Sequence, residues 1–208
     1  SGLSYDSGDF PKAREQVLAA ARYDDLLSQQ LAARAAGRLV GIGLACYTEY
    51  TGMGADVFRQ RGMADVPGIE AATVTMDPDG TVRCLVSFPS QGQGHATTIA
   101  QLVADRLGVP LGWISVEPVD TLAAPRGSGT FGSRGAVAML GTAAAAADRV
   151  RMKLQTLAAH RLEASPADVV LDDSRAHVRG FPDRAVAIAE LARLAWAPPL
   201  GGLPGELA

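Results

Sequence analysis

A β-hairpin signature in the middle of the chain limits the folds that this sequence can adopt. Two runs typical of strands, residues 70–76 and 81–88, flank the turn sequence Asp-Pro-Asp-Gly at residues 77–80. Proline presets a φ that suits a turn, and glycine accepts a positive φ. In the second run, four apolar side chains alternate onto one face: Val82, Cys84, Val86 and Phe88. The hairpin predicts an antiparallel strand pair, which argues against an all-parallel nucleotide-binding sheet.

A glycine-rich turn follows the second strand directly. Residues 90–98, Ser-Gln-Gly-Gln-Gly-His-Ala-Thr-Thr, lead into residues 99–107, whose apolar side chains have helical spacing. The glycines let the backbone approach a ligand, and the N–H groups at a helix start favour phosphate. Gln93 and His95 can hydrogen-bond to such a ligand. The turn lacks the third glycine of the dinucleotide fingerprint, so a tight connection without a ligand explains the spacing equally well.

A second glycine-rich loop precedes the longest predicted helix. Residues 127–134 read Gly-Ser-Gly-Thr-Phe-Gly-Ser-Arg, and an alanine-rich helical run follows over residues 137–163. The hydroxyl groups and the guanidinium of Arg134 can bind an anion. One loop of this composition is usually only a connection. Two such loops, both entering helices, favour a ligand with several phosphates or polar edges.

The remaining segments complete an α+β pattern, with an antiparallel or mixed sheet and packed helices. Helix end signals predict three further helices: one from Pro11 with Asp9 as its N-cap, one from Asp24 to a stop at Gly37, and one over residues 188–196. Alternating apolar residues predict four further strands: residues 39–48, 113–117, 169–171 and 176–179. Small residues on one face of the first of these strands suggest that another backbone packs closely there. An irregular loop is predicted over residues 50–67.

The domain prediction is one lobe over residues 1–197 and a linker over residues 198–208. The linker is rich in proline and glycine, which cannot continue a helix or pair in a central strand. A chain of 208 residues is long enough to bury a core of its own. A linker at this point indicates a section of a larger protein.

Composition argues against several classes of protein. A formal charge of -3 and a pI of about 5.6 disfavour a nucleic-acid partner. No apolar run approaches the roughly 20 residues of a membrane span, and no signal peptide pattern is present, so we expect a cytoplasmic protein. Two cysteines, Cys46 and Cys84, are too few for a disulfide framework or a metal–sulfur cluster. Both lie in strand-like runs and are predicted to be buried thiols.

No residue outside the two glycine-rich loops is a convincing general base, nucleophile or metal ligand. The three histidines lack the spacing of a zinc site, and no nucleophile elbow occurs. Glu49, Glu117 and Asp120 can face a site, but exposed or salt-bridged surface roles explain them as well. We therefore predict neither a catalytic residue nor a metal-ligating residue in this chain.

The two loops together resemble the cofactor segments of molybdenum hydroxylase large subunits. This family includes xanthine dehydrogenase, aldehyde oxidase and aerobic carbon monoxide dehydrogenase, and the resemblance is greatest to the carbon monoxide dehydrogenase-like branch. It rests on Ser-Gln-Gly-Gln-Gly-His at residues 90–95 and on Gly-Thr-Phe-Gly-Ser-Arg at residues 129–134. Residues 5–9, 48–52, 120–121, 162–164 and 178–180 also match, so the resemblance covers nearly the whole chain.

The resemblance implies that the two loops contact the pterin and phosphate part of a molybdopterin dinucleotide, commonly the cytosine form in bacteria. Eight residues are implied to contact it: Gln93, Gly94, His95, Thr130, Phe131, Gly132, Ser133 and Arg134. Gly132 is implied to lie nearest the metal. Two positions depart from the family: Ala96 replaces an acidic residue, and Gly135 replaces a small hydroxyl residue. Neither change removes a backbone donor.

The resemblance also implies an activity for the complete enzyme. Such an enzyme hydroxylates a small substrate with water and passes electrons to iron–sulfur and FAD partners, in a dimeric assembly. The family's glutamate general base follows this region in a glycine-rich segment that we do not find here. We therefore expect a section of a large subunit that is inactive alone. Two alternatives stay open: an independent nucleotide-binding module or NAD-type oxidoreductase, and a scaffold domain in which both loops are only structural.

Overall fold

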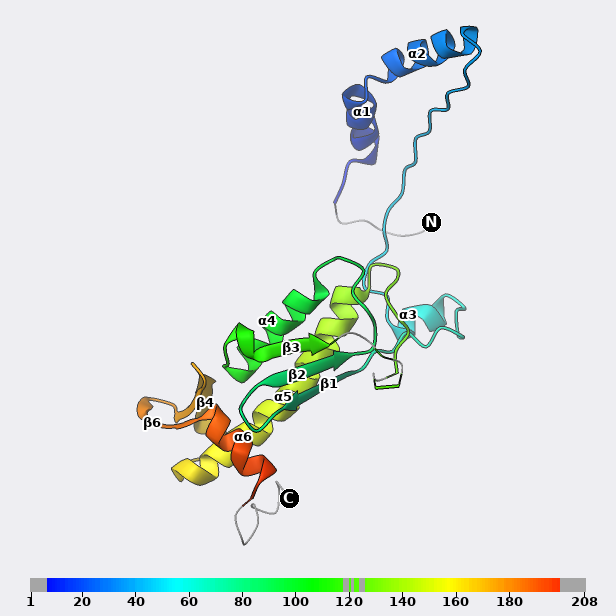
Figure 1. The fold of residues 1–208 in the computed structure, drawn as a ribbon. Coiled ribbons are helices and arrows are strands. Elements are labelled where there is room, and N and C mark those ends of the chain that lie inside the picture. The colour runs from blue at the N-terminus through cyan, green and yellow to red at the C-terminus, as the bar shows by residue number, and fades with distance from the viewer. Residues whose placement is uncertain (1–6, 118–119, 121, 124–125, 199–208) are drawn as a thin grey trace. The chain divides into compact units, whose positions relative to one another are not determined.

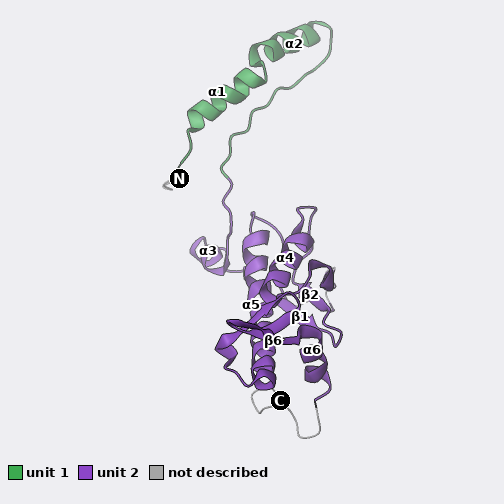
Figure 2. Cartoon of the chain, turned by 90° about the vertical axis from the view of Figure 1, so that its left-hand side faces the viewer, with its two compact units in different colours: residues 1–48 green, residues 49–208 purple. Residues whose placement is uncertain are grey.

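The structure is a computed structural model that describes residues 7–117, 120, 122–123 and 126–198. The chain divides into two units, residues 1–48 and residues 49–208 (Figure 2). The first unit contains α1 (Phe10–Ala20) and α2 (Tyr23–Ala35). The carboxylate of Asp9 caps α1 by accepting from the N–H of Lys12 at 3.0 Å. Both predicted helices are confirmed, and neither contains a buried residue.

The predicted strand at residues 39–48 is wrong. This segment adopts no helix or strand, and the side chains of Leu39 and Tyr47 are 91% and 85% exposed. A strand needs a neighbouring edge to pair its N–H and C=O groups, and no described strand pairs with it. Cys46 is consequently exposed, which corrects the prediction of a buried thiol.

A three-stranded mixed sheet lies at the centre of the second unit. The predicted hairpin is confirmed as β1 (Ala72–Met76) and β2 (Val82–Val86), with Val74 opposite Cys84. The predicted strand near residue 115 is confirmed as β3 (Ile114–Glu117), which pairs with β2 in parallel. The strand order is therefore β1-β2-β3.

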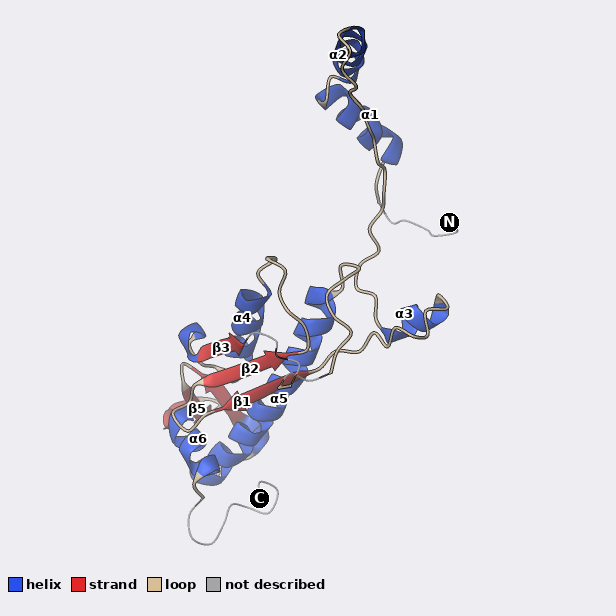
Figure 3. Ribbon diagram, turned by 45° about the vertical axis from the view of Figure 1, so that its right-hand side comes forward, coloured by secondary structure: helices blue, strands red, loops and turns tan. Residues whose placement is uncertain are grey.

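Two helices pack against each other on one face of this sheet (Figure 3). α4 (His95–Leu107) connects β2 to β3 and contacts β3, whereas α5 (Gly135–Leu162) contacts β1. α5 is the predicted long alanine-rich helix. The core between the layers includes these residues: Val82, Cys84, Val86, Phe88, Ile99, Val103, Leu107, Met139, Ala143 and Ala147. Burial raises the pKa of the Cys84 thiol to about 11, so this predicted buried thiol stays protonated at neutral pH.

A second, antiparallel sheet packs against α5 together with the last helix. It contains β4 (Val169–Asp172), β5 (Arg175–Val178) and β6 (Phe181–Ala187). The β4–β5 hairpin was predicted, but β6 was missed because Pro-Asp-Arg in its middle interrupts apolar alternation. The predicted last helix is confirmed as α6 (Ile188–Trp196), and the indole N–H of Trp196 donates to the carbonyl of Met76 at 2.9 Å.

The architecture confirms the predicted α+β class. Short helices complete it: α3 (Ala55–Gln60), within the predicted irregular loop, η1 (Leu111–Trp113) and η2 (Pro166–Asp168). Residues 199–208 of the predicted linker lie outside the described residues, as do residues 5–6 and 121 of the family resemblance. The single lobe over residues 1–197 stays a prediction. No helix in the described ranges has the length and apolar character needed to cross a bilayer.

Candidate functional site

The two glycine-rich loops meet where α4 and α5 begin (Figure 1). The hydroxyl of Thr130 donates to the carbonyl of Pro89 at 3.1 Å, which joins the second loop to the end of the β2 segment. A Cβ atom on Gly135 would lie 2.7 Å from Cε1 of His95. The first residues of the two helices are therefore in direct contact. The sequence predicted both loops, but it did not predict that they share one site.

The loops line a pocket of about 470 Å³, called the loop pocket, to which six residues with polar side chains contribute. Its lining residues are Glu49, Gln91, Gln93, His95, Thr130, Phe131, Gly132, Ser133, Gly135 and Ala136. Six of the eight residues implied by the family resemblance are among them. The other two are Gly94, which is the N-cap of α4, and Arg134, which is the N-cap of α5.

Neither helix start at the loop pocket is closed by a capping side chain. The first intrahelical bonds run from Thr98 N–H to the Gly94 carbonyl at 3.1 Å and from Ala138 N–H to the Arg134 carbonyl at 2.9 Å. The earlier N–H groups of each first turn remain open to a ligand. Because both helix dipoles place their positive ends here, the loop pocket favours an anion.

Gln93 and His95 offer side-chain groups to the same pocket. The side-chain oxygen of Gln93 accepts from the N–H of Gln91 and from the hydroxyl of Ser90. Its amide N–H₂ is the part that can donate to a ligand. His95 is buried, and its Nδ1 has no hydrogen-bond partner among the described residues. A buried unpaired nitrogen is costly, so the pocket fits a polar group that bonds to it.

The second loop presents a constrained backbone to the pocket. Gly132 and Ser133 have φ values of 56° and 47°, and this left-handed conformation is unfavourable for serine. Two contacts hold Ser133 in place. Its hydroxyl donates to Glu49 Oε1 at 2.9 Å, and its carbonyl accepts from the N–H of Gly52 at 3.2 Å. Glu49, considered earlier as a surface carboxylate, is therefore part of the pocket wall.

Arg134 lies buried behind the second loop. Its side chain is 0% exposed and pairs with the carboxylate of Glu70, which is 1% exposed. Nε, Nη1 and Nη2 also donate at 2.9, 2.9 and 2.7 Å to three backbone carbonyls, those of Met53, Gly129 and Gly68. Protein oxygens thus accept from four of the five N–H donors of Arg134, and its contact with a cofactor stays a prediction.

Glu70 was missed by the sequence reasoning. It stands at the beginning of the predicted strand over residues 70–76, immediately before an apolar run. A lone carboxylate at a strand end is ordinarily solvated. In the sequence, only the apolar residues after Glu70 indicate that its side chain is buried. They do not identify Arg134, 64 residues away, as its partner.

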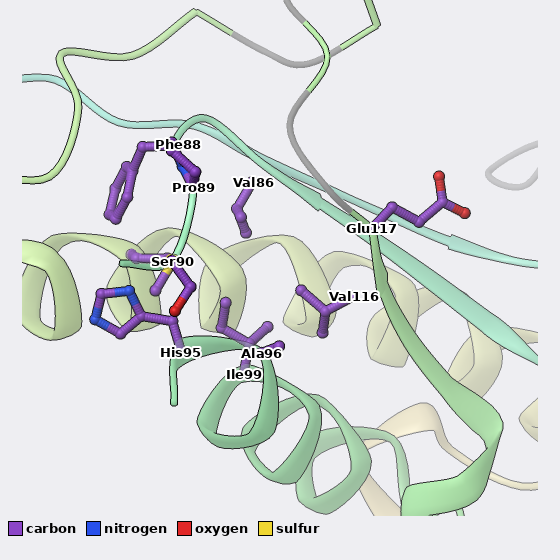
Figure 4. A pocket seen from close by; sticks show the side chains of 10 residues that line it. Val86, Phe88, Pro89, Ser90, His95, Ala96, Ile99, Val116 and Glu117 are labelled. Atoms are coloured by element: carbon purple, nitrogen blue, oxygen red, sulfur yellow. The ribbon is translucent and has the colours of Figure 1, made fainter. Parts of the chain in front are cut away.

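A second pocket, of about 340 Å³, shares His95 with the loop pocket and is mostly apolar (Figure 4). The rings of Phe88 and His95 meet edge to face, with centroids 6.1 Å apart. The carboxylate of Glu117 points away from the other labelled side chains. The start of α4 lines both pockets, but the start of α5 and most of the polar lining groups belong to the loop pocket. The apolar pocket is therefore the weaker candidate for an anionic ligand.

The other polar residues considered from the sequence lie outside the loop pocket. Asp120 accepts from the N–H of Leu122 at 2.8 Å, and Nδ1 of His177 lies 3.3 Å from the carbonyl of Val178. His160 is exposed on α5. Within the described ranges, no group of three or more His, Cys, Asp or Glu residues could hold a metal ion.

Comparison with known proteins concerns nearly the whole chain. A sequence profile of the molybdopterin cofactor-binding domain matches residues 16–204. The chain belongs to this family. Membership in the molybdopterin cofactor-binding domain family confirms the resemblance that was drawn from the two loop motifs. It also agrees with the observed α+β fold.

The relatives of this family member include the large subunits of two enzymes. The nicotine 6-hydroxylase large subunit of Paenarthrobacter nicotinovorans is 39% identical over 191 residues, covering 92% of this chain and 23% of that protein. The carbon monoxide dehydrogenase large chain of Afipia carboxidovorans is 34% identical over 98% of this chain and 26% of its own length.

A solved structure also matches nearly the whole chain. Quinoline 2-oxidoreductase from Pseudomonas putida 86 matches with a TM-score of 0.68 and 33% identity, over 98% of this chain and 26% of that chain. The present chain thus spans about a quarter of the length of the relatives that it matches.

Proposed function

We propose that the loop pocket binds the pterin and phosphate part of a molybdopterin dinucleotide, in its cytosine form, as one side of a molybdenum hydroxylase cofactor cradle. The observation that carries this proposal is the meeting of two uncapped helix N-termini at one pocket. Backbone donors and dipole ends suit phosphate oxygens. Six of the eight residues implied by the family resemblance line the same pocket, which supports this assignment over a generic anion site.

Each element of the pocket then has a distinct part in holding the cofactor. The first turns of α4 and α5 donate backbone N–H groups to the phosphate. The amide N–H₂ of Gln93 and Nδ1 of His95 supply directional hydrogen bonds to the polar edge of the pterin. Phe131 and Gly132, which line the pocket, would flank the pterin and exclude water. When bound, the cofactor supplies the molybdenum centre at which a small substrate is oxidised.

The complete activity belongs to a larger polypeptide in this proposal. That large subunit is an oxidoreductase that hydroxylates a small substrate with water and passes electrons to iron–sulfur and FAD partners in a dimeric, cytoplasmic assembly. The 208-residue chain alone has no turnover. Residues 39–48 agree with a larger polypeptide, because the apolar side chains of Leu39, Val40 and Leu44 are exposed and the segment pairs with no described strand.

The alternative of an NAD-type module has one observation in its favour. β2, α4 and β3 form a parallel strand–helix–strand unit, and the first turn lies at the carboxyl end of β2. Nucleotides often bind at that position in parallel sheets. However, β1 runs antiparallel to β2. The second loop also lines the same pocket, and a single dinucleotide turn does not account for it.

Changing Gln93 and Thr130 to alanine, in the polypeptide that naturally carries these residues, tests the proposed function. The double variant removes an amide donor and the hydroxyl that joins the loops. We expect the molybdenum and pterin content per polypeptide to fall by about tenfold or more, because each hydrogen bond contributes about 1 kcal/mol. Metal analysis and pterin fluorescence measure this content.

Thr156→Ala is the matched control, because this exposed hydroxyl donates only to the Met152 carbonyl within α5. The control is expected to keep its cofactor. A double variant that retained the wild-type cofactor content and activity would show that the loop pocket is not part of the cradle, and would favour the scaffold alternative.

A further inference from the structure

We propose that Glu70 and Arg134 are positioning residues, whose buried ion pair fixes the second loop in the shape that the loop pocket requires. The link to the cofactor rests on the proposed function. The effect on loop geometry does not, since it can be measured without any cofactor.

The ion pair connects segments that are distant in the sequence. Arg134 binds the carbonyls of residues 53, 68 and 129, as described above. Glu70 Oε1 accepts from the backbone N–H of Ser128 at 3.1 Å, and Glu70 Oε2 accepts from the hydroxyl of Ser87. The second loop is thereby attached to the strand segments on either side of the hairpin and to the segment before α3.

Gly127 gives an independent sign that the loop is fitted closely to this pair. A Cβ atom at Gly127 would overlap Oε2 of Glu70 and both side-chain atoms of Ser87. The backbone of the loop therefore passes directly over the buried carboxylate. The close approach fixes the beginning of the loop, and the guanidinium fixes its end.

The guanidinium also supports an aromatic side chain that lines the loop pocket. Cζ of Arg134 lies 5.3 Å from the ring centroid of Phe131 and 5.9 Å from that of Phe58. The two rings are themselves 5.5 Å apart, and Phe58 is fully buried. A cation at these distances attracts both rings. Movement of Arg134 would therefore move Phe131, which the proposed function places along the pterin.

The effect of the Glu70–Arg134 pair on the shape of the second loop can be measured separately from its effect on the stability of the fold. A buried ion pair often contributes little net stability compared with apolar residues of the same volume, whereas loss of one partner is strongly destabilising. Two methionines can fill the space of Glu70 and Arg134. They cannot bind the Ser128 N–H or the three backbone carbonyls.

The experiment uses Glu70→Gln, Arg134→Lys and the double variant Glu70→Met/Arg134→Met. The controls are Glu190→Gln and Arg161→Lys, the same changes in an exposed ion pair with an N–O distance of 3.0 Å. The first measurement is amide hydrogen exchange at Ser128 and Arg134 in the 208-residue chain without cofactor. The second is molybdenum and pterin content of the naturally occurring polypeptide. Melting temperature is measured for every variant.

The Ser128 N–H lies 3.1 Å from both Glu70 Oε1 and the Ile69 carbonyl. We expect its exchange to accelerate by about tenfold or more, because Glu70→Gln removes the charge of one acceptor and Arg134→Lys releases the carboxylate from the guanidinium that holds it. Core amides of α5 and both control variants keep their wild-type exchange rates. Cofactor content falls by a similar factor. The double variant Glu70→Met/Arg134→Met has a melting temperature close to that of wild type, but its cofactor content stays low. If the ion pair only stabilised the fold, the cofactor content would return together with the melting temperature.

Arg134→Lys decides the question, because lysine keeps the charge and much of the volume and loses only the forked geometry. A wild-type exchange rate at Ser128 in this variant overturns the proposal. Wild-type cofactor content in the methionine pair overturns it as well. If the unmodified polypeptide bound no cofactor, the proposed function would fail, and the exchange rates would still test the positioning role.

Discussion

Replacing Gly108 by alanine is expected to lower the free energy of unfolding by about 2–4 kcal/mol. Gly108 ends α4 with a φ of 65°, a conformation that costs an alanine about 1 kcal/mol. A Cβ atom there would lie 2.5 Å from the carbonyl carbon of Leu171 and 2.7 Å from the nitrogen of Asp172. These are backbone atoms of β4, so relief requires the second sheet to move. The Gly108 carbonyl also accepts from the N–H of Ser174 at 2.7 Å.

Urea denaturation of Gly108→Ala and of a matched control measures this effect. Gly141 lies within α5, and a Cβ atom there would meet nothing within 4 Å. Gly141→Ala is therefore expected to raise the free energy of unfolding by up to about 1 kcal/mol, from helix propensity alone. Equal stability of the two variants would contradict the close packing of α4 against the second sheet.

Gly127→Ala is expected to change the conformation of the second loop and to reduce the amount of bound cofactor. The backbone at Gly127 does not have a positive φ, so the effect is purely steric. The new methyl group overlaps Glu70 and Ser87. Overpacking of this kind costs about 1–3 kcal/mol, and it displaces the carboxylate that holds Arg134. We expect cofactor content to fall by about tenfold or more, a change equivalent to about 1.4 kcal/mol.

Thermal unfolding and molybdenum analysis measure the two effects of Gly127→Ala. Gly112→Ala is the control, because Gly112 has open space around its Cβ position and no positive φ. Its stability is expected to stay within about 0.5 kcal/mol of wild type. If Gly127→Ala kept its cofactor, the buried ion pair would not be responsible for the shape of the second loop.

Elements with strong local signals were predictable from the sequence. The Asp-Pro-Asp-Gly turn produced the β1–β2 hairpin, and the Asp9 cap preceded α1. The long alanine-rich run became α5, although it begins at Gly135, two residues before the predicted start. α4 likewise begins at His95, before the predicted helical run over residues 99–107, because the left-handed Gly94 allows the turn to close immediately.

Elements that depend on distant partners were not predictable. Residues 39–48 have the alternation of a strand, but alternation does not supply the edge that a strand must pair with. β6 has weak alternation and forms because β5 offers such an edge, even with an irregular register near Val178. Tertiary pairing, rather than local sequence, determines both outcomes.

The candidate site shows the same division between local and distant information. The two loop motifs identified the residues that line the loop pocket, because glycine, hydroxyl and amide groups before a helix are a local pattern. The contact between His95 and Gly135 joins residues 40 positions apart, and the Glu70–Arg134 ion pair joins residues 64 positions apart. Nothing in either segment reveals its partner, so the buried role of Arg134 became visible only in the structure.

A ¹H–¹⁵N NMR titration of the 208-residue chain with molybdopterin cytosine dinucleotide tests whether both helix starts bind one ligand. This method detects weak binding, which is expected of one side of a cradle. We predict that the first-turn amides of α4 and α5, at residues 95–97 and 135–137, shift together with one dissociation constant. The imidazole Nδ1 of His95 is expected to shift with them. Shifts confined to one helix start, or found only outside the loop pocket, would contradict the account.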